Sequence, residues 1–270
     1  MAETVVKSAA GACELVGTDR PLRYTYLSLT MGVDVKRDLN ESTILLTGAS
    51  GGLGTAVGAA LIERGAQLTL AGRSADRLAA SGLPGPQVTG DLADPDTGRQ
   101  AVAAHLDRYG RLDGIVNAAG EVAFGPLRDT DDATLERLVA SNLLGPLRLL
   151  RAALPHLDGG FVVNLSAVVA EQPPAGMAAY AATKAGLTAA DTALRRELRR
   201  ERIDVIDVRP PHTETGLAER PIAGDTPPLP EGLDPAFVAE RIVQAVEQGE
   251  REVAAAGFAP ELTTGPGGPS

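Results

Sequence analysis

The feature that most constrains the fold is a regular alternation of short apolar runs with longer amphipathic ones. The apolar runs predict strands at 43–47, 67–71, 87–89, 112–116, 160–165, 203–208 and 251–255. Between them, helices are expected at 52–64, 75–80, 95–109, 131–154, 178–202 and 235–248. Strands that alternate with helices of this length imply crossover connections and a parallel sheet. The sequence therefore predicts an α/β fold: one domain with a doubly wound parallel sheet.

Residues outside this alternating region carry less pattern. Residues 1–40 show no clear periodicity and are expected to be a flexible N-terminal extension. Residues 41–258 would form the domain, and the Gly- and Pro-rich residues 259–270 a disordered tail.

Composition narrows the partners. A net charge of -10 argues against binding to nucleic acid or to an anionic membrane. The single Cys13 excludes an internal disulfide and a multi-cysteine metal site, and it fits a reducing compartment. Because no apolar run is long enough to span a bilayer, we expect a cytoplasmic protein without a metal, acting on a small molecule.

A glycine-rich turn stands between the first strand and the first helix, over residues 47–54 (TGASGGLG). Glycines there allow a tight turn and a close approach to a pyrophosphate, while the following helix directs its first amides at the anion. No lysine follows, which disfavours a triphosphate loop. The turn indicates a dinucleotide site.

Tyr180 and Lys184 lie four residues apart in the helix expected at 178–202, so they share one face. Lys184 is one of only three lysines in the chain. A neighbouring ammonium favours the ionised phenol, and a phenol whose pKa is lowered can exchange protons near neutral pH. The pair indicates an acid/base site.

Three motifs in this order resemble those of the short-chain dehydrogenase/reductase family: TGxxxGxG at 47–54, NAAG at 117–120 and YxxxK at 180–184. The resemblance covers roughly residues 42–257. It implies a seven-stranded Rossmann sheet with a nicotinamide cofactor across the strand ends. It also implies a homodimer or homotetramer formed through the helices at 131–154 and 178–202.

The resemblance also assigns roles to individual residues. Tyr180 would be the acid/base, Lys184 would hold the nicotinamide ribose, and Asn142 would support the lysine through water. The remaining cofactor contacts would be Gly48, Ser50, Gly52, Leu53 and Gly54 at the pyrophosphate, Asp91, Leu92, Asn117, Ala118, Ala119 and Gly120 around the adenosine, and Pro210, Thr213 and Thr215 near the nicotinamide.

Cofactor choice is expected to depend on the end of the second strand. Relatives that use NAD have an acid there, whereas this chain has Gly72 followed by Arg73. A guanidinium grips a 2′-phosphate in fork geometry. The sequence thus predicts NADP rather than NAD.

The family's catalytic serine position falls on Ala167, and Ser166 is its neighbour. Because side chains alternate along a strand, the hydroxyl of Ser166 should face the other side unless the strand bulges. Three outcomes stay open: Ser166 takes the role, the substrate or another group such as His212 supplies the donor, or the enzyme is slow or inactive on ordinary carbonyls.

The sequence therefore predicts an NADP(H)-dependent carbonyl reductase or alcohol dehydrogenase. The alternative is a non-catalytic dinucleotide-binding sensor or partner subunit. The proline-rich segment 216–231 is short, so the substrate pocket is expected to be open, with Phe124 and Met177 as apolar liners.

Overall fold

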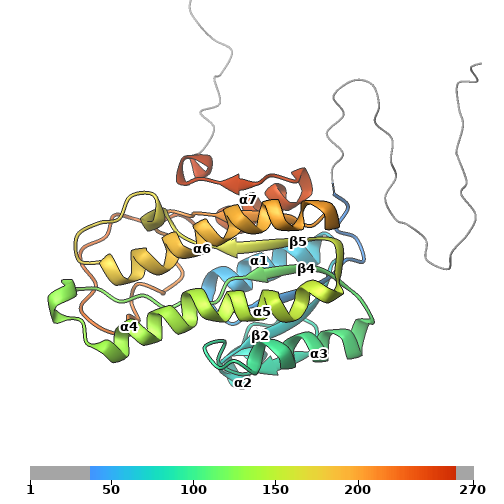
Figure 1. Cartoon of the computed structure of the whole chain (residues 1–270), viewed down its shortest axis with the longest axis horizontal. Helices are drawn as coiled ribbons and strands as arrows, with labels where there is room; N and C mark the ends of the chain where they lie inside the picture. The colour runs from blue at the N-terminus through green and yellow to red at the C-terminus, as the bar shows by residue number, and fades with distance from the viewer. Residues whose placement is uncertain (1–36, 260–270) are drawn as a thin grey trace, which may run out of the picture. The chain divides into compact units, whose positions relative to one another are not determined.

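A seven-stranded sheet runs through the centre of the protein in the order β3-β2-β1-β4-β5-β6-β7 (Figure 1). The computed structural model describes residues 37–259, and every strand pair in it is parallel. The strands are β1 (Thr43–Thr47), β2 (Gln67–Gly72), β3 (Gln87–Thr89), β4 (Leu112–Asn117), β5 (Leu157–Leu165), β6 (Asp204–Val208) and β7 (Glu252–Val253). The predicted doubly wound parallel sheet is confirmed.

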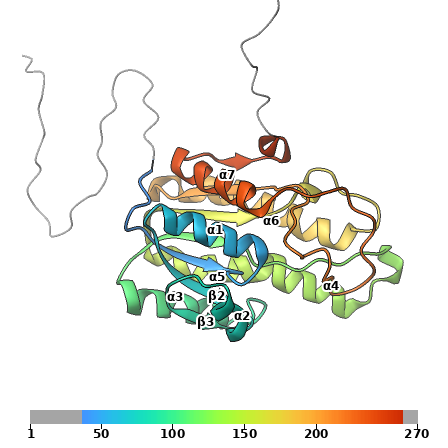
Figure 2. The ribbon, with the colours of Figure 1, turned by 180° about the vertical axis from the view of Figure 1, so that it is seen from behind.

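Helices cover both faces of this sheet. They are α1 (Gly52–Glu63), α2 (Ala75–Ala80), α3 (Thr97–Tyr109), α4 (Asp132–Val139), α5 (Gly145–Ala153), α6 (Ala178–Glu197) and α7 (Pro235–Gln248). Helices α4, α5 and α6 lie in front of the sheet in Figure 1, while α1 and α7 lie on its other face in Figure 2. Two layers of helix around one sheet give two separate apolar cores.

Successive side chains of β1 point to opposite faces of the sheet, so this strand contributes to both cores. Ile44 and Leu46 of β1 pack with α1 and α7, whereas Leu45 packs with α3 and α5. All three side chains are fully buried. A strand buried on both faces has no polar face, which explains why β1 is a continuous apolar run in the sequence.

The helix predicted at 131–154 is interrupted. A π-helical turn, Ala140–Leu144, separates α4 from α5, and the Gly145 amide donates to the carbonyl of Ala140. Pro146 has no N–H to donate to the carbonyl of Asn142, so the regular ladder cannot pass this point. The interruption falls on Asn142, and such turns are frequent at functional sites.

Other boundaries differ by a few residues. β5 begins at Leu157 rather than at 160, and α6 gives way to a 3₁₀ turn at Leu198–Glu201. β7 consists of Glu252 and Val253 alone. The differences in β5 and α6 lie at the ends remote from the glycine turn, and none of the three changes the strand order.

Residues 37–40 pack onto the sheet domain, since Leu39 is buried in the core of α1 and α7 and Arg37 pairs with Asp204 at 2.5 Å. The rest of the expected extension, with Cys13, lies outside the described residues, as does 260–270 of the expected tail. Within 37–259, no helix combines the length and the apolar character that crossing a membrane requires.

Candidate functional site

The glycine turn is shaped by close backbone contacts. Gly48 has a φ of +69°, and a Cβ there would lie 2.5 Å from the amide nitrogen of Ala119. A Cβ on Gly54 would lie 2.1 Å from the carbonyl oxygen of Gly48. Helix α1 begins at Gly52, and among residues 37–259 no side chain caps it. The turn can therefore present bare backbone and a helix N-terminus to an anion, which fits a dinucleotide pyrophosphate.

Two other residues assigned to the turn lie differently. The hydroxyl of Ser50 is near the end of β2, since a Cβ on Gly72 would lie 3.1 Å from it. Leu53 is partly buried and packs against the core of α1 and α7. Ser50 thus has a polar atom at the strand ends, while the side chain of Leu53 contributes to packing.

Tyr180 and Lys184 share the buried face of α6, as predicted. Tyr180 is 6% exposed and Lys184 4%. The Lys184 ammonium lies 5.9 Å from the centre of the Tyr180 ring and donates to the carbonyl oxygen of Leu165 at 2.7 Å. The lysine is therefore fixed at the carboxyl end of β5, beside the tyrosine.

Asn142 approaches the same place from the π-helical turn. Its side chain accepts from the Glu121 amide at 2.8 Å and donates to the Glu121 carbonyl at 2.9 Å. A Cβ on Gly120 would be 3.4 Å from both the Asn142 Oδ1 and the Lys184 Nζ. The structure thus brings Asn142, Lys184 and the NAAG segment together.

Burial dominates the electrostatics of the tyrosine and lysine. Burial raises the pKa of Tyr180 above its usual range. Burial lowers the pKa of Lys184 to about 8, against the opposing charge of Asp207. The expected lowering of the Tyr180 pKa by Lys184 is therefore wrong for this arrangement, because the ammonium is directed at Leu165 while the phenol has lost its water.

The hydroxyl of Ser166 is directed away from a substrate. It donates to the Asp207 carboxylate at 2.5 Å and to the Val208 carbonyl at 3.0 Å, both on β6. Ser166 is 4% exposed. Ala167, which occupies the expected serine position, has only a methyl group to offer a carbonyl oxygen.

Arg73, at the expected 2′-phosphate position, contacts a residue that the sequence analysis did not single out. Its side chain is 55% exposed and pairs with Glu121. Glu121 also pairs with Arg137 of α4, whose guanidinium lies 2.7 Å from Asp91. The side chain of Leu92, next to Asp91, is buried in the core of α3 and α5. The only sequence signal for Glu121 was that it directly follows the NAAG motif.

The segment after β6 lies against the glycine turn. A Cβ on Gly52 would be 2.8 Å from the Thr215 Cα. Pro210 accepts from the Val168 amide at 3.0 Å, and the Thr213 hydroxyl donates to the Pro211 carbonyl at 3.0 Å. The assigned residues of this segment are therefore held beside the turn and β5.

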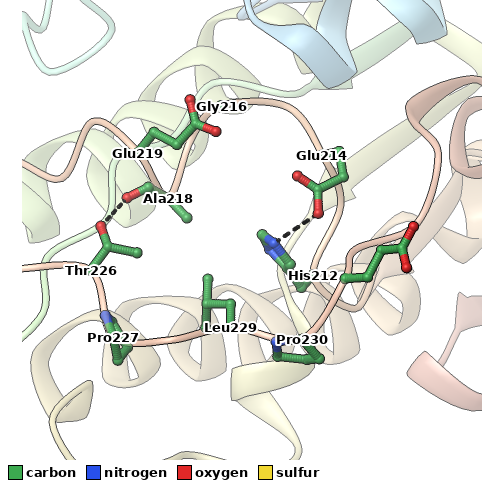
Figure 3. A pocket seen from close by; sticks show the side chains of 10 residues that line it. His212, Glu214, Gly216, Ala218, Glu219, Thr226, Pro227, Leu229 and Pro230 are labelled. Atoms are coloured by element: carbon green, nitrogen blue, oxygen red, sulfur yellow. Dashed lines mark hydrogen bonds and ion pairs between the residues drawn. The ribbon is translucent and has the colours of Figure 1, made fainter.

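His212 lines a pocket of about 250 Å³ formed by this segment (Figure 3). Its Nε2 lies 3.5 Å from the Glu214 carboxylate, and the pocket also includes Glu219 and Glu231. This pocket is lined entirely by residues 212–231, so neither Tyr180 nor Lys184 contributes to it.

The expected open pocket around Phe124 and Met177 is wrong. These two residues line a hollow of only about 10 Å³. Segment 216–231 is attached there, because the Phe124 amide donates to the Ala223 carbonyl at 3.0 Å and the Ile222 amide to the Val122 carbonyl at 2.8 Å. Ala218 and Ala223 pack on the apolar cluster that contains Val122 and Phe124, so the short segment fills the space beside Phe124.

Residues 42–224 match the family model of the short chain dehydrogenases. The chain belongs to the short-chain dehydrogenase/reductase family. It is an oxidoreductase of this type, with the family's α/β Rossmann-like sheet.

Relatives and solved structures cover most of the chain. An uncharacterized oxidoreductase of Staphylococcus haemolyticus is 30% identical over 78% of this chain and 93% of its own. The dehydrogenase/reductase SDR family member 7B of Bos taurus is 29% identical over 88% of this chain and 81% of its own. A short-chain dehydrogenase of Burkholderia cenocepacia, solved in complex with NADP, has a TM-score of 0.72 at 28% identity, covering 81% of this chain and 96% of its own.

Below this short-chain dehydrogenase site, a chain of buried hydrogen bonds crosses the sheet. Thr47 donates to Asn117 at 3.3 Å, Asn117 donates to Asn164 at 2.6 Å, and Asn164 donates to Asp191 of α6 at 2.5 Å. Asn117, assigned to the adenosine side, thus uses its side chain inside the sheet. Asp191 lies seven residues after Lys184, two helical turns along the same face, which was the sequence signal for it.

The buried carboxyl of Asp191 has few groups that would stabilise its charged form. Burial raises its pKa to about 8, the Asn164 hydrogen bond opposes the shift, and the charge of Asp207 adds to it. The folded protein therefore holds a proton that the unfolded chain releases near pH 4, so this group's contribution to stability is lost as pH rises from about 4 to about 8.

We expect Asp191→Asn to stabilise the protein relative to wild type increasingly as pH rises from 6 to 8. The amide oxygen can still accept from Asn164, and it carries no proton to lose. The stability difference should grow by at most about 1.4 kcal/mol for each pH unit. Thermal unfolding at several pH values would measure it, with exposed Asp158→Asn as the control. A difference that does not change with pH would contradict the buried protonated carboxyl.

Proposed function

We propose that this protein is an NADP(H)-dependent oxidoreductase that interconverts carbonyl groups and secondary alcohols. The observation that carries the proposal is the meeting of Lys184 and Asn142 at Gly120, beside the glycine turn, with the Tyr180 ring centre 5.9 Å from the lysine ammonium. Acid/base groups thus stand where the carboxyl ends of β1, β4 and β5 meet, which is the edge where ligands bind in such sheets.

A bound nicotinamide would supply hydride transfer to or from the substrate carbon. Tyr180 would donate the proton to the carbonyl oxygen in the reducing direction and remove it in the oxidising direction. The Lys184 amine is held by the Leu165 carbonyl. When this amine is protonated, it would place a positive charge beside the phenol. Asn142 fixes the backbone of Glu121 and so the NAAG segment that lines the site.

Arg73 supports the choice of NADP, because it is exposed at the end of β2 with no acid at that position. The structures solved with NADP and with NADPH that this chain resembles at 28% identity agree with that choice. Val139 at the end of α4 and Leu144 in the π-helical turn are exposed apolar residues. They support self-association through the α4–α5 region. We propose a homodimer or homotetramer on that basis.

Ala167 favours a second candidate, a dinucleotide-binding protein with little or no turnover. The hydroxyl of Ser166 is engaged by Asp207, so the usual serine has no replacement on β5. Removing one donor from a developing oxyanion costs about 10² to 10³ in rate. A slow enzyme and a sensor would both show cofactor binding, and they differ in whether turnover can be restored.

We expect Tyr180→Phe to lower turnover of a carbonyl substrate by at least about 10²-fold, since the proton donor is lost. Cofactor affinity, measured by calorimetry, should change little. Tyr109→Phe is the matched control, because the Tyr109 hydroxyl donates to the Leu68 carbonyl at 3.0 Å and is remote from the site. Undiminished turnover in Tyr180→Phe would mean that another group is the acid.

We expect the KM for NADPH to be lower than that for NADH. Arg73→Gln should raise the KM for NADPH about tenfold, because the amide loses the charged fork that holds a phosphate. Arg111→Gln, which removes another surface guanidinium, is the control. A lower KM for NADH in wild type would overturn the assignment of NADP.

We expect Ala167→Ser to raise turnover about 10²-fold by supplying the missing oxyanion donor. Ala170→Ser adds the same hydroxyl to the next turn and should leave turnover unchanged. Steady-state kinetics with several aldehydes and ketones would measure both. If tight NADPH binding persists without turnover in Ala167→Ser, the non-catalytic candidate is favoured.

A further inference from the structure

The ion pair between Arg73 and Glu121 joins two strand ends that are not neighbours. Arg73 directly follows β2, and Glu121 lies four residues after β4 ends. In the sheet, β1 lies between β2 and β4. The pair therefore spans the carboxyl end of β1, where the glycine turn begins.

The backbone beneath the pair is continuous from β2 to β4. The Ala49 amide donates to the Ala71 carbonyl at 3.2 Å, and the Ala118 amide donates to the Thr47 carbonyl at 3.2 Å. A Cβ on Gly48 would be 2.6 Å from the Ala118 carbonyl oxygen. A nucleotide bound across the strand ends at this turn must pass the position of the ion pair.

Glu121 is the fixed partner. Asn142 holds both its amide and its carbonyl, and the carboxylate receives two bonds from Arg137, at 2.5 Å and 2.8 Å. Burial acts against the charge, yet Arg137 and Arg73 hold the pKa of Glu121 below its usual range. Arg73, with 55% of its side chain exposed, is the partner that can move.

We propose that the Arg73–Glu121 ion pair occupies the adenosine end of the nucleotide position in the ligand-free protein, and that a bound 2′-phosphate replaces Glu121 as the anion on Arg73. The inference rests on the proposed binding of NADP. Every nucleotide must open the pair, but only one with a 2′-phosphate gives Arg73 a new partner. Glu121 keeps Arg137, so the exchange leaves no buried carboxylate unpaired.

The ligands for the test are adenosine 5′-monophosphate and adenosine 2′,5′-bisphosphate, which need no nicotinamide and no turnover. Calorimetry would give their Kd values for wild type, Glu121→Gln, Arg73→Gln and the double variant. Glu121→Gln should tighten both ligands by about threefold to fivefold, the range of a partly exposed charge pair.

Arg73→Gln separates the two functions of the guanidinium. It should tighten the monophosphate by the same factor, because the ion pair is gone, and weaken the bisphosphate, because the phosphate loses its partner. In the Arg73→Gln background, Glu121→Gln should change neither Kd further. A guanidinium that only grips phosphate would leave the monophosphate unchanged.

Unchanged monophosphate binding in both single variants would overturn the proposal. Should Glu121→Gln fail to fold, the monophosphate arm of Arg73→Gln decides alone, since Arg73 is at the surface. Glu250→Gln is the matched control, because Arg241 of α7 donates two 2.7 Å bonds to the Glu250 carboxylate, just after that helix. Tightening in this control would attribute the effect to net charge and also overturn the proposal.

The experiment distinguishes failure of the ion-pair proposal from failure of the proposed preference for NADP. A wild-type protein that binds the bisphosphate no more tightly than the monophosphate would contradict the preference for NADP. The monophosphate measurements would still show whether the ion pair obstructs a nucleotide.

Discussion

The close approach of the glycine turn to the NAAG segment determines the arrangement of the site. A Cβ on Gly48 would fall within 2.6 Å of Ala118 and Ala119, so these two backbones can meet only without a side chain. Parallel pairing of β1 with β4 brings them to the same edge, in register from Ile44 with Gly114 to Thr47 with Asn117. This contact aligns the expected phosphate site with the segment that Asn142 and Lys184 approach. Any widening there would separate the expected phosphate site from Lys184 and Asn142.

Several polar side chains are buried inside the sheet, below the proposed site at its edge. The chain from Thr47 to Asp191 and the separate Ser166–Asp207 contact bury two carboxyls, Asp191 and Asp207. Asp207 opposes the loss of charge on Lys184 and at the same time favours the protonated form of Asp191. The same buried group thus favours the charged form of Lys184 and the neutral form of Asp191.

The sheet was predictable because period and length determine it, and β1 and β3 coincide with the predicted residues. Spacing predicted that Tyr180 and Lys184 share a face of α6, and the family resemblance, not spacing, indicated that Asn142 approaches Lys184. Contacts that depend on side-chain direction in three dimensions were not predictable. The orientation of Ser166, the packing of segment 216–231 beside Phe124, and the pairing of Arg73 with Glu121 all involve residues 40 or more positions apart or loops without periodicity. Local patterns contain no information about such contacts.

Asn142 links the expected catalytic group to the Arg73–Glu121 ion pair. Its side chain belongs to the expected catalytic group, yet both of its hydrogen bonds to Glu121 fix the residue that holds Arg73. The π-helical turn that presents Asn142 is imposed by Pro146, so its position is set by the backbone rather than by a flexible side chain. Because Asn142 and Arg137 hold Glu121, breaking the proposed ion pair requires movement of Arg73 alone. A protein built this way can admit a nucleotide while the geometry around Tyr180 and Lys184 stays in place.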